Sequence, residues 1–133
     1  MYGAPGIAYV YFVYGMHYML NVVTEAEGKA AAVLIRAVVP IAGLSIMEQL
    51  RGGKGKDLAG GPAKLCQALA IDRTFNGWDL TLGQKLWIEN NRSVPHELVR
   101  RGPRIGIQYA SPQDREAPWR FWIDGHYFTD QIG

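Results

Sequence analysis

The chain has 133 residues, of which 48% are hydrophobic and 20% are charged, and its formal net charge at pH 7 is +2. This length fits one domain with a substantial core, and this composition excludes a disordered or highly charged chain. A charge of +2 allows an anionic partner but does not require one. Cys66 is the only cysteine, so no internal disulfide can form. With no secretory segment in view, this favours a reducing cytoplasm.

The stretch from Ala8 to Asn21 organises the rest of the chain, and it holds four of the seven tyrosines and no charge. Tyr9 and Tyr11 are two residues apart, so an extended strand places both rings on one face. Gly15 can take the positive φ of a tight turn at little cost, and a second strand follows it. The sequence therefore predicts a β-hairpin with Tyr14 at its tip.

Two other interpretations of this stretch stay open. The uncharged run from Gly6 to Val23 approaches the length of about 20 apolar residues that crosses a bilayer. Its tyrosines, histidine and asparagine suit hydrocarbon poorly, however, and its periodicity favours strands over a helix. An ordinary core hairpin without a binding role also fits, because aromatic residues are common in strands.

A buried strand is predicted from Ala30 to Val39, with Arg36 as its only charged residue. A buried arginine needs an ionic partner or a cleft, so Arg36 is either part of a structural ion pair or a site residue. Helical spacing of apolar residues then predicts a helix from Leu44 to Arg51, which glycines terminate. The segment Gly52 to Gly61 lacks the Ser or Thr that a nucleotide-binding loop places after Gly-Lys, so it is predicted to be a surface loop.

A second helix is predicted from Gly61 to Ala70, with a proline at its first position. Leu65, Cys66 and Leu69 fall on its inward stripe, so Cys66 is predicted to be a small core residue and not a nucleophile. Lys64 lies in the first turn, where the helix dipole disfavours a cation. It either contacts a phosphate or is solvated at the surface.

The remaining elements are a loop over Asp72–Trp78, a short strand over Leu86–Glu89, a loop over Asn90–Pro95 and a final strand over Trp119–Ile123 whose apolar residues complete the core. Arg100, Arg101 and Arg104 precede Ile105, and this cluster either faces solvent or lines, with Lys64, a groove for anions.

The residues alone show no convincing catalytic group. No His or Cys cluster has metal-ligand spacing, and no serine-centred nucleophile motif is present. The glutamates fall in turns or on surfaces where the charge is solvated, namely Glu25, Glu27, Glu48, Glu89, Glu97 and Glu116. The sequence therefore offers an aromatic wedge and basic helix ends, without an evident general base.

Five blocks of the chain resemble the alkyladenine (3-methyladenine) DNA glycosylase family, in the family's order and over nearly the whole length. They are Tyr9–Asn21, Val33–Ala37, Gly61–Leu69, Pro103–Ile107 and Pro118–Phe121. The resemblance implies a single-domain α+β fold, with a mainly antiparallel curved sheet, a protruding β-hairpin and a few packed helices. It also implies an enzyme of base-excision repair that hydrolyses the N-glycosidic bond of alkylated purines after base flipping. The expected partner is double-stranded DNA, bound by a cytoplasmic monomer that needs no cofactor, metal or membrane.

The resemblance also implies which residues contact DNA. Tyr14 matches the wedge that enters the minor groove and fills the gap left by the flipped base, and Met16 accompanies it. For Lys64, a phosphate contact is expected from its place at the start of its helix, with less support from the resemblance than for Tyr14 and Met16.

The same resemblance implies a pocket and a water site. Tyr11 matches a stacking wall of the base pocket, and Asn21 matches a residue whose amide conflicts with the exocyclic amino group of guanine. Arg36 and the backbone carbonyl of Ile105 match the groups that hold the attacking water. These matches favour a site role for Arg36 over a structural ion pair.

One departure from the family bears on activity. In the family, a segment before the residue that matches Met1 supplies a glutamate that activates the water, and we expect this chain to be N-terminally truncated and to lack it. A general base contributes about 100- to 10,000-fold in rate. An inactive fragment and a non-catalytic module that binds alkylation damage therefore remain alternatives.

Overall fold

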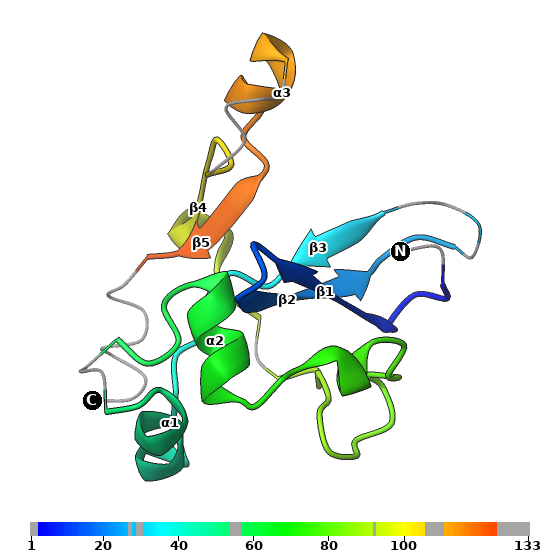
Figure 1. Ribbon diagram of the computed structural model, residues 1–133. Coiled ribbons are helices and arrows are strands. Elements are labelled where there is room, and N and C mark those ends of the chain that lie inside the picture. The colour runs from blue at the N-terminus through cyan, green and yellow to red at the C-terminus, as the bar shows by residue number, and fades with distance from the viewer. Residues whose placement is uncertain are drawn as a thin grey trace. The chain divides into compact units, whose positions relative to one another are not determined.

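The computed structural model describes residues 3–26, 28, 31–53, 57–91, 93–105 and 111–124. Its contacts divide the chain into two compact units, Met1–Glu89 and Asn90–Gly133. The elements in order are β1 (Ala8–Val13), β2 (His17–Val23), β3 (Ala32–Leu34), α1 (Leu44–Leu50), α2 (Pro62–Ala68), the 3₁₀ turns η1 (Arg73–Phe75) and η2 (His96–Leu98), β4 (Val99–Gly102), α3 (Pro112–Glu116) and β5 (Arg120–Ile123) (Figure 1). Two antiparallel sheets with short helices confirm the α+β class. The single domain stays a prediction, since two compact units can belong to one domain.

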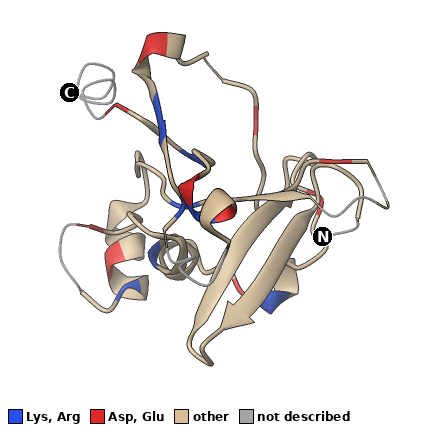
Figure 2. Cartoon of the chain, turned by 90° about the horizontal axis from the view of Figure 1, so that it is seen from above, with Lys and Arg blue, Asp and Glu red and all other residues tan. Residues whose placement is uncertain are grey.

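The predicted hairpin is confirmed in the first unit. Strands β1 and β2 are antiparallel, with Tyr9 opposite Asn21 and Tyr11 opposite Met19, and β3 pairs with the other edge of β2. In Figure 2 the hairpin is free of charged residues and its turn projects from this unit. The run that was long enough for a membrane span thus forms two strands, and no helix in the described part of the chain is long and apolar enough to cross a bilayer.

The core of the first unit lies between the hairpin and α2. Every second residue of β1 and β2 points inward, where α2 and the segments around it meet the sheet. The residues of this cluster are Ala8, Val10, Leu20, Ala59, Leu65, Cys66, Ala68, Ile71 and Leu80, and Val23 and Leu58 are buried outside it. Cys66 is confirmed as a core residue, and burial raises the pKa of its thiol to about 11. This core holds the hairpin by one face. On the other face Val23 and Asn21 are also buried beside β3, Tyr9 and Tyr11 are half-buried, and the turn is exposed.

The outer edge of β1 is covered by the loop that follows η1. The Asn76 side chain accepts a hydrogen bond from the Val10 N–H at 2.9 Å. Two residues earlier on β1, the Ala8 N–H donates to the Trp78 carbonyl and the Ala8 carbonyl accepts from the Gly77 N–H, each at 2.8 Å. A strand edge with unpaired backbone groups is a site of unwanted pairing, and these bonds close the base of the hairpin against it.

The helix predicted from Leu44 to Arg51 is confirmed as α1, and two glycines end it. Gly52 and Gly53 both have φ near +70°, and their N–H groups donate to the carbonyls of Gln49 and Glu48. This left-handed C-terminal cap satisfies carbonyls that the helix leaves without partners, and glycine adopts it without strain.

Three sequence predictions in the first unit are wrong. The strand over Ala30–Val39 is only three residues long in β3, because Val38 donates its N–H to the Ala59 carbonyl and Val39 precedes a proline. Val33, Val38 and Val39 are also exposed. The Gly52–Gly61 segment is not wholly a surface loop, since Leu58 and Ala59 are buried.

The third is the strand over Leu86–Glu89, whose residues form no strand. Within it, the Leu86 N–H donates to the Gln84 carbonyl in a local turn. The Trp78 indole N–H lies 3.0 Å from the Leu86 carbonyl and 3.1 Å from the Gln84 carbonyl. These backbone groups are therefore already paired with a turn and a side chain, and they do not form a ladder with another strand.

The second unit contains a two-stranded antiparallel sheet, in which Arg101 lies opposite Phe121. The final strand is confirmed as β5, but its aromatic residues do not complete a core. Trp119 and Phe121 are each 58% exposed and Trp122 is 42% exposed. Arginines stack on these rings instead, with Arg104 at 4.8 Å, Arg101 at 5.9 Å and Arg120 at 4.3 Å from the respective ring centres. Among the described residues of this unit, no other strand or helix covers these rings, so alternation alone does not bury them.

Candidate functional site

The tip of the hairpin carries an exposed aromatic ring on a strained backbone. Tyr14 has φ 54° and is 89% exposed, and Gly15 beside it has φ 65°. The Met16 N–H donates to the Val13 carbonyl at 3.1 Å and closes the turn. Positive φ at both central residues is typical of the mirror-image hairpin turns, which favour Asn-Gly.

A bulky residue in this conformation loses free energy relative to asparagine or glycine. Packing does not explain Tyr14, because its ring is exposed. Strained positions of this kind cluster at functional sites. The geometry therefore indicates that the ring is kept for a contact outside the chain, as the predicted wedge requires. Met16, which is 71% exposed, lies beside it in the same turn.

Two pairs of rings stiffen the hairpin below its tip. Phe12 and Tyr18 lie opposite each other, with ring centres 4.8 Å apart. Tyr9 and Tyr11 lie on the other face, with ring centres 5.5 Å apart. Aromatic pairs across and along strands each add up to about 1 kcal/mol of stability, so the turn is carried on a rigid support.

The sheet face opposite the core collects the predicted pocket residues. Tyr9, Tyr11, Met19, Asn21 and Leu34 share this face by strand register. Both tyrosines are half-buried and Asn21 is only 7% exposed. The Asn21 amide donates to the Tyr9 carbonyl at 3.3 Å, which fixes its orientation. The structure thus brings Tyr11 and Asn21 together on one face, with phenol rings beside a fixed amide.

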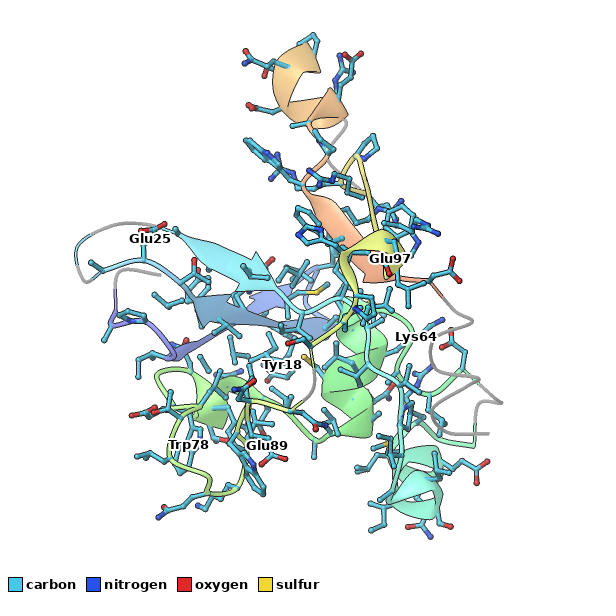
Figure 3. The ribbon with its side chains drawn as sticks, turned by 180° about the vertical axis from the view of Figure 1, so that it is seen from behind. Tyr18, Glu25, Lys64, Trp78, Glu89 and Glu97 are labelled. Carbon is cyan, nitrogen blue, oxygen red and sulfur yellow. The ribbon has the colours of Figure 1, made fainter. Side chains whose placement is uncertain are left out.

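Lys64 is not a free lysine. It lies near the start of α2 (Figure 3), and its Nζ is 2.8 Å from Asp57 Oδ2. Both side chains are exposed, and the hydrogen bond from Lys64 lowers the pKa of Asp57. The sequence allowed a phosphate contact or a solvated lysine at this position and missed the ion pair. The only sequence feature that could have indicated this ion pair is the glycine-rich segment after α1, which lets the chain turn back so that residue 57 approaches α2.

The two predicted water-positioning residues belong to different units. Arg36 follows β3 and is partly buried, and no hydrogen bond or ion pair joins it to any described residue. Ile105 follows β4, and its side chain is 61% exposed. Residues 106–110, which include Ile107 of the fourth resembling block, lie outside the described part of the chain. The roles of Arg36 and Ile105 stay predictions, as does the groove of the arginine cluster with Lys64.

Carboxylates and other polar groups add no further centre. The described glutamates are all exposed, as predicted, and Glu27 lies outside the described residues. In the described ranges no three His, Cys, Asp or Glu side chains gather closely enough to hold a metal ion. Arg51, which the sequence placed only at a helix end, is 8% exposed and donates to the Gln67 side chain. The site is therefore built from aromatic rings, one amide and cations.

The structure is that of an α+β protein with an exposed tyrosine at the turn of a hairpin that carries no charged residue. Comparison with known proteins identifies the family. The methylpurine-DNA glycosylase (MPG) family matches residues 1–127, and this chain belongs to that family. The resemblance of the five sequence blocks is thereby confirmed.

Several curated relatives carry the name "Putative 3-methyladenine DNA glycosylase". The protein of Carboxydothermus hydrogenoformans is 48% identical over 132 residues, which cover 98% of this chain and 67% of the relative. That of Chlorobaculum parvum is 43% identical, with 100% of this chain and 63% of the relative covered. That of Methanocella arvoryzae is 47% identical, with 92% of this chain and 60% of the relative covered. The chain thus spans about two thirds or less of the length of these relatives.

Proposed function

We propose that the chain acts in base-excision repair as a DNA-3-methyladenine glycosylase, a hydrolase that cleaves the N-glycosidic bond between an alkylated purine and deoxyribose. The family and the names of the relatives support this proposal and favour it over a non-catalytic damage-binding module. The observation that carries it is the exposed ring of Tyr14 on its left-handed turn. The proposed partner is double-stranded DNA, bound by a monomer in the cytoplasm.

Base flipping is the first step of the proposed reaction. The glycosidic bond of a stacked base is out of reach, so the nucleotide has to leave the helix, which costs a few kcal/mol of unstacking. Tyr14 enters the minor groove and fills the gap, and Met16 packs against the neighbouring bases. The two ring pairs below the turn stiffen the hairpin, so that Tyr14 keeps its position while the base is displaced.

Base selection follows on the tyrosine face. An alkylated purine is electron-poor, so it stacks well on the electron-rich ring of Tyr11. Asn21 rejects guanine because its fixed amide conflicts with the exocyclic amino group and leaves polar atoms without partners. The hydrogen bond to the Tyr9 carbonyl supports this role, since a freely rotating amide would adapt to guanine.

Hydrolysis requires a water molecule held against the anomeric carbon of the flipped nucleotide. The oxygen of this water forms the new bond to carbon and one proton of the water is released to solvent. The electron pair of the broken glycosidic bond goes to the ring nitrogen of the purine, so that the cationic alkylated purine leaves as a neutral base. By family resemblance, Arg36 and the backbone carbonyl of Ile105 hold the water. We assign the general base to none of the described glutamates, because all of them are exposed.

Release of free base from duplex DNA carrying 3-methyladenine tests the proposal. We expect only slow release by the chain, because none of the described glutamates serves as its general base, and a further loss of roughly tenfold or more in release and in lesion preference for Tyr14→Ala, because unstacking is no longer offset. Trp87→Ala, which removes another exposed ring of the same unit, is the control and leaves both unchanged.

Two outcomes would contradict the glycosylase proposal. Lesion-selective binding without release would support the damage-binding module instead. Equal binding of damaged and undamaged duplex, with no release, would rule out both functions.

A further inference from the structure

The carboxylate of Asp57 lies where an anion from outside the chain would bind the ammonium group of Lys64. Lys64 Nζ lies 2.8 Å from Asp57 Oδ2, with 45% of the lysine side chain and 60% of the aspartate side chain exposed. The backbone N–H of Gly60 and the positive charge of Arg51 also lower the pKa of this carboxyl, by less than the hydrogen bond from Lys64 does. A Cβ at Gly60 would lie 2.1 Å from Asp57 Oδ1, so only glycine allows this close approach. Asp57 is therefore held as an anion by three separate groups.

The Lys64–Asp57 ion pair contributes little to the stability of α2. A cation in the first turn of a helix is disfavoured by the helix dipole, and Lys64 is the third residue of α2. An exposed ion pair contributes only about 0–1 kcal/mol, so this one opens readily when a stronger anion arrives. While the pair is closed, however, the lysine presents no net charge to an approaching phosphate.

We propose that Asp57 is an internal counter-ion that competes with a DNA phosphate for Lys64, and that it thereby sets how strongly the chain holds the DNA backbone. The proposal rests on the proposed function, because it requires DNA as the partner. A carboxylate and a phosphate offer the same kind of anionic oxygen to an ammonium group. When DNA binds, a phosphate replaces the Asp57 carboxylate as the partner of Lys64. This exchange limits the affinity for undamaged DNA, so recognition of the lesion depends on the hairpin.

The test is Asp57→Asn, with binding to an undamaged duplex measured by fluorescence anisotropy across a series of salt concentrations. The variant keeps a side-chain oxygen for the Gly60 N–H and removes the competing charge. We expect about two- to fivefold tighter binding at low salt. The slope of log K against log salt should become steeper by up to about one, because one more cation acts on the phosphates.

Asp72→Asn is the matched control. Asp72 is also an exposed carboxylate with a lowered pKa, but its hydrogen bonds are to Thr74 and it has no lysine partner in the described structure. It adds the same unit of charge without freeing Lys64. An equal gain from Asp72→Asn, or no gain from Asp57→Asn, would overturn the proposal.

A double-mutant cycle separates this inference from the proposed function. In a Lys64→Gln background, Asp57→Asn should leave duplex binding unchanged, and a gain that persists there would refute the competition. If Asp57→Asn binds duplex more tightly but no variant releases base, the inference stands and the glycosylase proposal fails. If base is released but Asp57→Asn has no effect, only the inference fails. If no variant binds duplex DNA, both fail.

Discussion

Tyr14 occupies a turn position that favours asparagine. The residue that suits DNA binding is therefore not the residue that gives the most stable fold. Its φ of 54° is readily adopted by asparagine and resisted by a tyrosine. We predict that Tyr14→Asn raises the free energy of unfolding by roughly 0.5–1 kcal/mol while it weakens lesion-selective DNA binding. Urea denaturation and anisotropy on the same preparation measure both effects.

Ala70 provides the control for this prediction. It is exposed, has φ 55°, and lies just after α2, far along the chain from the turn. Ala70→Asn should raise stability in the same direction and leave DNA binding unchanged. A Tyr14→Asn variant that is less stable than the parent would show that the ring supports the fold, and the wedge argument would lose its main physical basis.

The buried thiol of Cys66 makes the free energy of unfolding depend on pH, and the sign of this dependence follows from its burial. Its thiol pKa rises from 9.0 to about 11 in the folded chain. Between these values the unfolded thiol loses its proton and the folded thiol keeps it, so the unfolded state binds fewer protons and stability falls as pH rises. The loss should be on the order of 2 kcal/mol by pH 11.

The measurement compares urea denaturation of the wild type and Cys66→Ala between pH 8 and about 11. Other groups titrate in this range in both proteins, so the difference between the two curves isolates the thiol. We expect the variant to be less stable at pH 8, because it leaves a small cavity, and to lose less stability as the pH rises. Parallel curves would mean that the thiol ionises equally in both states.

Residues whose roles depend on local pattern could be predicted from the sequence. The position of Tyr14 at a turn and the burial of Cys66 follow from a turn glycine and from helical spacing, and the structure places both as expected, whereas the role of Asn21 came only from the family resemblance and stays a prediction. The partner of Lys64 could not be predicted, because it depends on how a glycine-rich segment folds back. Asn76 was missed for a similar reason, since its bond to Val10 spans 66 residues.

At the scale of elements, Asn76 is the residue on which the edge of the hairpin depends. Its side chain is the acceptor for the Val10 N–H, and the adjacent loop bonds reach only the base of β1. We predict that Asn76→Ala lowers the free energy of unfolding by about 1–3 kcal/mol, because it leaves that N–H without its partner. Asn91→Ala, in an exposed loop position, should change it by less than about 0.5 kcal/mol. Equal effects of the two substitutions in urea denaturation would contradict the edge role.

Elements with strong local signals were predicted well, and elements defined by their neighbours were not. The hairpin, α1 and α2 have clear periods and are bounded by Gly or Pro, so pattern alone locates them. The apolar run around β3 ends at a proline, but its pattern does not show how many of its residues pair. The backbone groups available on β2 decide that three residues do. The ring-rich β5 reads as a core strand, but alternation gives no information on whether a second layer exists to bury it.

At the scale of the molecule, the two units differ in how much of their surface they bury. The first unit has a contiguous core between its sheet and α2, whereas the second has two strands with exposed rings. An isolated two-stranded sheet is marginally stable in water, and stability within one chain often varies by region. We predict that the amides of β1, β2 and α2 exchange with solvent much more slowly than those of β4 and β5.

Hydrogen exchange followed by mass spectrometry checks this difference, and Leu65→Ala shows whether it arises from the core. Leu65 is 1% exposed, and truncating a buried leucine costs about 2–5 kcal/mol. The variant should therefore speed exchange in the hairpin and α2 and leave the already fast exchange of β4 and β5 unchanged. Slow exchange in β4 and β5 of the wild type would mean that the arginine–aromatic pairs hold the second unit more firmly than a two-stranded sheet allows. In that case the exposed rings of Trp119 and Phe121 would be part of a stable surface and not of a loosely held strand.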